Sequence, residues 1–306
     1  MTSIIALVAT IVGIALSMAN LVNTLLTIAP KVTRPVKKPV AARVRAIKES
    51  LQKFVDITDQ FHLEYQAIVD IETGAIVSIE ALTRWESPAL GKVRPIEFIP
   101  LAEAMSVTED LTHWVIKTAI KDLAGWGCRT SISVNVSPVD LESPVLLSAI
   151  CHECALANVD KSLIELEVTE RAISFDQTLF ISALKDCHSL KIKMKVDDFG
   201  TGDSSFKRFV DSPLWAGLKI DMSLIPESVS DRERMATIRA ISSLCHDLEI
   251  ECIAEGIETP RQIEALKLAG ITRAQGFYFY RPMVASALTP HIMALPDPKS
   301  GKDFTK

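Results

Sequence analysis

The sequence predicts a closed α/β barrel that follows a hydrophobic N-terminal helix. Two observations predict the barrel. From about residue 60 onward, β-rich runs alternate with amphipathic helical patterns, which indicates a parallel sheet. About eight such runs within roughly 245 residues match the strand number of a closed barrel. The helix is predicted by residues 1–30, which contain no Asp, Glu, Lys or Arg. With 306 residues and 48% hydrophobic content, the chain is neither a disordered segment nor a small disulfide scaffold.

The uncharged run from Ile4 to Ile28 has the length of a membrane span. As a helix it would rise about 37 Å, enough to cross the hydrocarbon core of a bilayer. No Lys or Arg precedes it and it is long for a signal peptide, so an uncleaved anchor is favoured over a cleaved signal. Basic residues and no acids follow, at positions 31, 34, 37, 38, 43, 45 and 48. This flank predicts a single-pass protein whose body lies on the cytoplasmic side. Its charges either contact anionic lipid headgroups or form only a solvated flank.

The charge of the remaining chain differs sharply from that of the flank. Pro30, Pro35 and Pro39 predict an extended linker that ends near residue 48. Outside the basic flank, the chain holds 26 basic and 38 acidic residues, a net charge of −12. A body this acidic is a poor general binder of nucleic acid polymers. An anionic substrate would therefore need metal ions or focused donors.

Each barrel element is predicted from its local pattern. Runs rich in β-branched and apolar residues, bounded by turn residues, predict strands at 63–69, 76–82, 131–136, 163–168, 193–196, 217–220, 251–254 and 274–279. Apolar residues spaced three and four apart predict helices at 95–105, 111–126, 145–157, 177–190, 204–210, 232–248 and 261–269. Gly74 lies in the short link between the first two strands, so this pair is expected to form an antiparallel hairpin. In the helix at 232–248, one apolar face is expected to contain Met235, Ile238, Ile241, Leu244 and Cys245.

The cysteines and histidines do not form a recognisable zinc site. The six cysteines are at positions 128, 151, 154, 187, 245 and 252, and a cytoplasmic body would keep them as thiols. Cys151 and Cys154 form a lone C-x-x-C, and the helical stripe of Leu146, Ile150, Cys154 and Ala155 favours core packing over zinc binding. The six histidines are scattered. A catalytic metal would therefore have oxygen ligands, which favours Mg²⁺ or Mn²⁺.

Polar residues occur late in the predicted strands or just after them, except that one of them, Gln275, opens the last run. They are Glu80, Asn135, Glu167, Glu170, Asp197, Asp198, Lys219, Asp221, Glu255, Glu258 and Gln275. In a barrel the carboxyl ends of the strands meet at one rim, where active sites lie. Converging acids repel one another unless cations neutralise them, so the pattern predicts a two-metal site suited to the attack of water on a phosphodiester. The alternative for any single acid is an N-cap of the next helix, which is favoured for Asp176 and Asp231.

The loop Phe199-Gly200-Thr201-Gly202 follows the pair of aspartates. Its two glycines permit a tight turn and a close backbone approach to a ligand. It is no Walker A loop, because no G-K-[ST] follows. An ordinary strand-to-helix turn is the alternative interpretation.

Nine segments together resemble one known family. They are YQAIVD (65–70), EALTRW (80–85), PIEFIPLAE (95–103), SVNVSP (133–138), ELEVTE (165–170), DDFGTG (197–202), LKID (218–221), AEGIET (254–259) and QGFYFYRP (275–282). At these residues, and over roughly residues 55–285, the sequence closely resembles the EAL-domain family of cyclic di-GMP phosphodiesterases.

The resemblance implies a modified TIM (β/α)8 barrel with one antiparallel strand. It also implies hydrolysis of cyclic di-GMP to linear pGpG with two Mg²⁺ or Mn²⁺ ions, and a homodimer formed through the barrel. Together with the N-terminal run, it predicts a protein of the bacterial inner membrane whose catalytic domain lies in the cytoplasm. The expected domains are an anchor at 1–30, a linker at 31–54, the barrel at 55–290 and a tail at 291–306.

Metal and water-activating roles are implied position by position. By resemblance, Glu80, Asn135, Glu167 and Asp197 are ligands of one metal, and Asp198 serves the second. The expected catalytic residues are Glu80 itself, Lys219, which orients or deprotonates the attacking water, and Glu255, which holds metal-bound water.

Further residues are implied to bind substrate or to support the site. Arg84 resembles a contact to the substrate phosphate, which suits a bidentate guanidinium. Gln66 resembles a residue of the substrate pocket, and Gln275 is expected to support it. Glu170 resembles the residue that positions the loop of Gly200 and Gly202, and thereby the dimer. Glu258 and Asp221 are expected to support the site from nearby.

Three departures from the family pattern leave alternatives open. Ala67 stands where the family usually has Pro, Asp203 replaces the usual Tyr, and the stretch between Asp198 and Lys219 is one residue longer than usual. The last two concern the loop that couples dimerisation to activity in the family. A catalytically silent receptor for cyclic di-GMP, acting through a protein partner, is therefore the second hypothesis. A barrel hydrolase acting on other phosphodiesters is the third.

Overall fold

A computed structural model describes residues 38–170, 177–201, 209 and 214–296 of the chain. The expected anchor at 1–30, almost all of the helix expected at 204–210, and Asp176, Gly202 and Asp203 lie outside the described residues. Among the helices in the described ranges, none combines the length and the apolar character that a bilayer span requires.

Eight strands close into a barrel, as the sequence predicts. They are β1 (Phe61–Asp70), β2 (Ile76–Ser87), β4 (Ser131–Asn135), β5 (Ile164–Thr169), β6 (Lys193–Phe199), β7 (Gly217–Ile220), β8 (Glu251–Ala254) and β9 (Arg273–Gln275). The order is β1-β9-β8-β7-β6-β5-β4-β2, and the pairing of β2 with β1 closes the ring. Only β1 is antiparallel to its neighbours within this ring, which confirms the single antiparallel strand. Two short strands, β3 (Gly91–Val93) and β10 (Met283–Val284), pair with β2 and β1 outside the ring.

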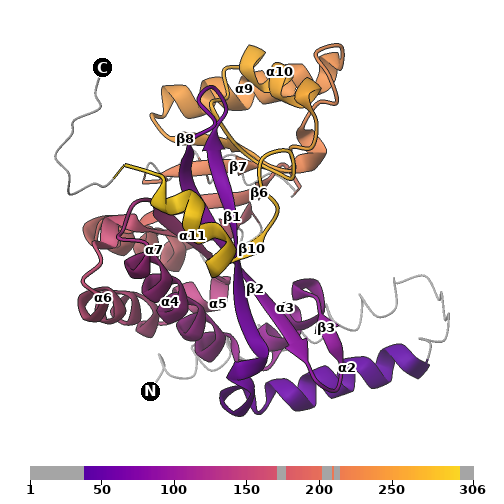
Figure 1. Cartoon of the computed structure of the whole chain (residues 1–306), viewed down its shortest axis with the longest axis vertical. Helices are drawn as coiled ribbons and strands as arrows, with labels where there is room; N and C mark the ends of the chain where they lie inside the picture. Colours follow the sequence, from indigo (N-terminus) through magenta and orange to yellow (C-terminus); the bar gives the residue numbers. More distant parts are fainter. Residues whose placement is uncertain (1–37, 171–176, 202–208, 210–213, 297–306) are drawn as a thin grey trace, which may run out of the picture. The chain divides into compact units, whose positions relative to one another are not determined.

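The long pair formed by β1 and β2 is prominent in Figure 1. These strands form the predicted hairpin, with Gly74 at a φ of +71° in the turn. Strand β2 continues five residues beyond the predicted end, to Ser87, because its second half pairs with β1 on one side and with β3 on the other. Glu80 therefore lies in the middle of a strand rather than near its end.

The last strand differs from its prediction in the opposite direction. Strand β9 ends at Gln275, although a run to residue 279 was expected. Gly276 explains the early end, because a Cβ atom there would lie 2.1 Å from the carbonyl oxygen of Ile257. The chain can pass that backbone only at a glycine, and it then turns back so that Tyr280 N donates to Gly276 O. Gln275 thus becomes a strand-end residue.

Most predicted helices are present with small shifts at their ends. They are α3 (Pro95–Ala104), α4 (Thr108–Gly125), α6 (Val145–Ala157), α7 (Gln177–Ser189), α9 (Arg232–Asp247) and α10 (Pro260–Leu268). Leu146, Ile150 and Cys154 are buried in α6 as expected, whereas Ala155 is exposed. In α9 the expected apolar face is buried, except that Leu244 is only half-buried. Asp231 caps α9 through its bond to Arg234 N, which confirms the capping interpretation.

Several helical segments were not predicted. They are α2 (Lys38–Leu51), α5 (Pro138–Glu142), α11 (Ala285–Met293) and three short 3-10 turns, η1 (Phe54–Gln60), η2 (Lys161–Leu163) and η4 (Met222–Leu224). The expectation of an extended linker up to residue 48 is wrong over α2. Pro39 stands in the first turn of that helix, where its missing N–H costs no hydrogen bond. The boundary expected after residue 290 falls inside α11.

The interior of the barrel contains a layer of charged side chains beneath the rim. Lys195 on β6 bonds Glu165 on β5 at 2.6 Å and Glu251 on β8 at 2.8 Å. It reaches Glu251 past Gly217 of β7, which has no side chain; a Cβ atom there would lie 3.0 Å from Glu251 Cβ. Barrel interiors are usually filled by branched aliphatic residues, so this layer depends on its charges being paired.

The ionisation of this buried layer follows from its pairing. Burial opposes the charged form of Lys195, but Glu165 and Glu251 outweigh it and raise the lysine pKa above its usual value. Burial likewise opposes the charged form of Glu165, and Lys195 outweighs it and lowers the glutamate pKa. Lys193 also contacts Glu165, at 3.3 Å, but its side chain is 40% exposed.

We expect Lys195→Ala to lower the free energy of unfolding by about 3 kcal/mol, because it removes the buried cation of Glu165, which keeps only the 40% exposed Lys193. The variant also removes one of the two close cations of Glu251, which keeps Arg273 at 2.6 Å. Urea unfolding followed by circular dichroism measures the loss. The matched control is Lys193→Ala, which removes a half-exposed partner of the same glutamate and should cost about 0–1 kcal/mol. Equal losses in the two variants would contradict the buried network.

Candidate active site

Lys219 lies at the centre of the predicted group of acids. Its Nζ atom is 2.6 Å from Glu255 Oε1 and 2.8 Å from Glu167 Oε2. It is 3.1 Å from both Glu80 Oε2 and Asp197 Oδ1. The acids come from β2, β5, β6 and the residue after β8, so the barrel brings together side chains that are far apart in sequence. The convergence predicted from the strand pattern is present for these five residues.

Three amide side chains hold this group in place. Asn135, at the end of β4, donates to Glu80 Oε1 at 2.7 Å. Gln275 donates to Glu80 Oε2 at 2.8 Å and to Gln66 Oε1 at 3.1 Å. Gln66 on β1 in turn donates to the carbonyl of Tyr280 at 3.0 Å. Both oxygens of Glu80 are therefore oriented by donors, although this residue lies in the middle of its strand.

Asp197 and Asp198 reach one cavity although they are consecutive residues. A regular strand would point their side chains to opposite faces. The register between β6 and β7 shifts between Val196 and Phe199, and Asp198 has a φ of +53°. Positive φ is uncommon for residues other than glycine. This local irregularity lets both aspartates line the same cavity.

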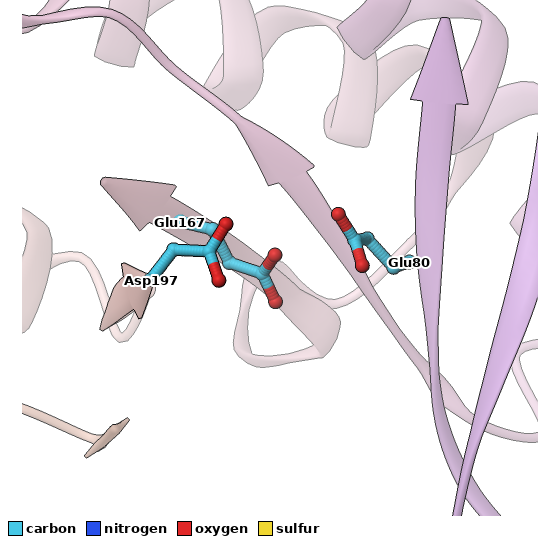
Figure 2. Close-up of side chains that lie close together, drawn as sticks. All are labelled: Glu80, Glu167 and Asp197. Carbon is cyan, nitrogen blue, oxygen red and sulfur yellow. The ribbon is translucent and has the colours of Figure 1, made fainter. Parts of the chain in front are cut away.

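The oxygen atoms of the site fit divalent cations. Figure 2 shows the carboxylates of Glu80, Glu167 and Asp197 turned toward one another. One oxygen from each of these residues lies within 4.8 Å of the others, and the same holds for Asp197, Asp198 and Glu255. Glu167 Oε1 is buried without a hydrogen-bond partner, and a single ammonium among the acids leaves a surplus of negative charge. An all-oxygen donor set of this kind suits Mg²⁺ or Mn²⁺.

The acids influence one another's ionisation. Burial, together with the charges of Glu80 and Asp197, raises the pKa of Glu167 to about 8 against the opposing effect of Lys219. Burial and the charge of Asp197 raise the pKa of Asp198 to about 6. Burial is also the main cause that raises the pKa of Glu255 well above its usual value. Acids of this kind release protons when a metal binds among them.

Glu80 and Lys219 are shifted toward their charged forms. Burial opposes the carboxylate of Glu80, but Lys219 and the bonds from Gln275 and Asn135 outweigh it and lower its pKa. Burial opposes the ammonium of Lys219, and the four carboxylates outweigh it and raise its pKa well above the usual value. An ammonium and a carboxylate therefore face one another at the centre, and the charge of each favours the charged form of the other.

The cavity over this group has a volume of about 490 Å³. It is lined by Lys219, the two glutamines and five acids, which are Glu80, Asp197, Asp198, Glu255 and Glu258. Met222 and Phe277 add an apolar wall that the sequence analysis did not identify. Arg281 lies over the Phe277 ring, 4.4 Å from its centroid. Phe277 lies within the segment QGFYFYRP and Met222 directly follows the segment LKID, so both could have been found from their closeness to these family motifs.

Arg84 is not brought into contact with the acids. It follows Glu80 by four residues on the same face of β2, which places it about 13 Å further along the strand. Its Nε atom donates to Glu64 Oε2 at 2.7 Å, and both side chains are less than a third exposed. A phosphate that bound Arg84 would have to compete with Glu64.

Within the described residues, a hydrogen bond joins the loop after β6 to the residue that follows β5. Gly200 N donates to Glu170 Oε2 at 2.9 Å, so the structure brings these two predicted residues together. Gly200 has a φ of +104°, and a Cβ atom there would lie 2.1 Å from Leu224 Cδ1. Asp221, by contrast, accepts from Ser223 N at 2.9 Å and caps η4, so it has the capping role that was the alternative for every acid.

Comparison with known proteins identifies the family. The family model that matches this chain is that of the EAL domain, and the match covers residues 48–282. The chain belongs to the EAL domain family.

Curated relatives of this EAL protein include two named phosphodiesterases. The cyclic di-GMP phosphodiesterase PA2567 of Pseudomonas aeruginosa is 33% identical over 249 residues, which is 80% of this chain and 42% of the relative. The cyclic di-GMP phosphodiesterase PdeR of Escherichia coli is 31% identical over 232 residues, which is 75% of this chain and 35% of the relative. The chain thus spans less than half the length of these relatives.

Solved EAL structures share the fold. The EAL enzyme Bd1971, bound to cAMP and cyclic di-GMP, superimposes with a TM-score of 0.76 and 30% identity, over 84% of this chain and 70% of that one. The PaMucR phosphodiesterase in complex with c-di-GMP superimposes with a TM-score of 0.73 and 31% identity, over 79% of this chain and 99% of that one.

Removal of one acid should weaken metal binding by the EAL barrel. We expect Asp197→Asn to reduce Mn²⁺ affinity by about tenfold or more, because ligand charge sets the affinity of oxygen sites. Titration calorimetry measures the change. Asp231→Asn is the matched control: it alters an acid that caps α9 away from the cavity, and its Mn²⁺ affinity should equal that of the unaltered protein. Equal affinity in all three proteins would rule out this site for the metal.

Proposed function

We propose that this chain is a phosphodiesterase that hydrolyses cyclic di-GMP to linear pGpG. The observation that carries the proposal is the group around Lys219: four carboxylates, a neighbouring fifth acid and oriented amides gather at one end of an EAL barrel. Relatives named cyclic di-GMP phosphodiesterases support this substrate, as do solved EAL structures bound to cyclic di-GMP.

Two divalent cations would be held by residues of this group. Glu80, Asn135, Glu167 and Asp197 would hold one ion, and Asp198 together with Asp197 would hold the second. Such a pair supplies activation of a water molecule and neutralisation of the leaving oxygen of a phosphodiester. Magnesium and manganese both suit the oxygen ligands.

The side chains of the chain itself position the reactants. The ammonium of Lys219 lies within 3.1 Å of four carboxylates and, in our proposal, orients the attacking water among them. Glu255 accepts a hydrogen bond from that water. Gln275 and Asn135 keep both oxygens of Glu80 in place, so that its charge does not need to reorganise during the reaction.

The substrate would extend from this group toward Arg84. One phosphate would lie over the acids and the second would reach the guanidinium, which is suited to bidentate phosphate binding. Met222 and Phe277 would contact a base on the apolar side of the cavity. Arg84 would exchange its bond to Glu64 for a bond to the phosphate.

We further propose that the chain acts at a membrane and as a dimer. The uncharged run at 4–28 and the basic flank after it support an anchor in the bacterial inner membrane, with the barrel in the cytoplasm and the flank near lipid headgroups. The bond between Gly200 and Glu170 supports a defined position for Gly200 next to the expected dimer contact. The barrel would then be held next to a second copy by both segments.

The decisive test is turnover of cyclic di-GMP by the purified full chain with Mn²⁺. We expect conversion to pGpG. In Glu80→Gln we expect at least about a hundredfold loss of kcat, because the variant loses one carboxylate of the acid group and each tenfold loss corresponds to about 1.4 kcal/mol of transition-state stabilisation. Glu86→Gln is the matched control, since this exposed acid lies on the same strand and its change should leave kcat unaltered. Nucleotide binding without turnover would favour the receptor hypothesis instead.

The ion pair between Arg84 and Glu64 predicts opposite effects on KM. Arg84→Ala should raise KM for cyclic di-GMP by about tenfold, the loss of about one charge-assisted bond. Glu64→Gln removes the competing carboxylate and should lower KM. Steady-state kinetics with both variants measures these changes. If KM were unchanged in both variants, Arg84 would have no role in binding the substrate.

A further inference from the structure

Two of the six cysteines meet at the end of the barrel opposite the acid cavity. Cys245 is in the last turn of α9, and Cys252 is the second residue of β8. The connection between them is compact, since Ile250 N donates to the carbonyl of Cys245 at 2.9 Å. Cys245 is 1% exposed, and its thiol is in hydrogen-bonding contact with that of Cys252.

A cavity of about 650 Å³ gives access to this pair. Both cysteines line it, together with the basic side chains Arg239, His246 and Arg273. The cavity lies where β8 and β9 begin, whereas Glu255 and Gln275 follow or end those strands at the other rim. It is therefore separate from the metal and substrate site described above.

The arrangement of the two sulfur atoms favours oxidation as a pair. A hydrogen bond from the Cys252 thiol lowers the pKa of Cys245, and the same bond raises the pKa of Cys252. A thiolate is the nucleophilic form of a cysteine. Cys187 is a contrasting case, because its buried thiol has no thiol neighbour and burial raises its pKa to about 12.

We propose that Cys245 and Cys252 are a redox modification site, which a peroxide converts reversibly into a disulfide. The Cys245 thiolate attacks one peroxide oxygen and the O–O bond breaks, which gives a sulfenic acid and a hydroxide ion; the hydroxide takes up the proton that the Cys245 thiol released on ionisation and becomes water. The Cys252 sulfur then attacks the sulfenic sulfur, and its proton leaves with the hydroxyl as a second water. Two electrons pass from the two thiols to one peroxide.

The bridge would link α9 to β8 within a short stretch of chain. Disulfides of cytoplasmic proteins are usually transient and redox-sensing, which matches a pair that a cavity exposes to small oxidants. This proposal does not rest on the phosphodiesterase activity, because neither cysteine contacts the acids of that site.

Peptide mass spectrometry of the full chain tests the proposal directly. Trypsin releases one peptide, residues 240–261, which contains both cysteines and no internal Lys or Arg. After treatment with hydrogen peroxide and then iodoacetamide, we expect this peptide to lack two hydrogen atoms and to carry no alkyl group. Dithiothreitol should restore two thiols that react with iodoacetamide. A peptide alkylated at both cysteines after peroxide treatment, or one carrying sulfinic acid without a bridge, would overturn the proposal.

Single variants separate the roles of the two thiols. In Cys252→Ser, Cys245 should stop at the sulfenic acid, which dimedone traps. Cys187→Ser removes a buried thiol outside the pair, and its peptide 240–261 should still form the bridge. Circular dichroism checks the fold of each variant. If Cys252→Ser failed to fold, the mass of the unaltered peptide would still decide the question.

Discussion

One ammonium group among four carboxylates determines most of this structure. Lys219 contacts Glu80, Glu167, Asp197 and Glu255 within 3.1 Å, and without its charge these buried acids would repel one another. The acids come from strands that are distant in sequence, so the barrel must close before the contacts form. The same surplus of negative charge makes the rim suited to divalent cations.

A second lysine, Lys195, contacts carboxylates in the same way one layer deeper in the barrel. Glu165 and Lys195 precede Glu167 and Asp197 by two residues on the same strands, so the pleat places one charged layer below the other. In the lower layer Glu165 and Lys195 are buried and Glu251 is 21% exposed, whereas the upper layer opens into the acid cavity. The polar interior thus serves stability below and ligand binding above.

The sequence predicted the barrel well because alternating strands and helices leave a clear periodic pattern. It also identified Asn135, Glu167, Lys219 and Glu255, since each lies at or near a strand end that faces the rim. It could not predict why Asp198 joins Asp197, because that depends on a register shift and a positive φ. Nor could it place Arg84, whose partner Glu64 is set by the hairpin register. The sequence does not reveal helix α2, because a proline such as Pro39 occurs in extended chain and equally well in the first turn of a helix.

The close passage of Gly276 over Ile257 mechanically joins two parts of the rim. Ile257 N donates to the carbonyl of Gln275, and Tyr278 N donates to the carbonyl of Ile257, so two backbone hydrogen bonds hold the two segments together. Gln275, which orients Glu80, is the last residue of β9. Glu255, which contacts Lys219, follows β8 directly. Because these bonds couple the two segments, a displacement of one would displace the other, and both sides of the acid group would move together.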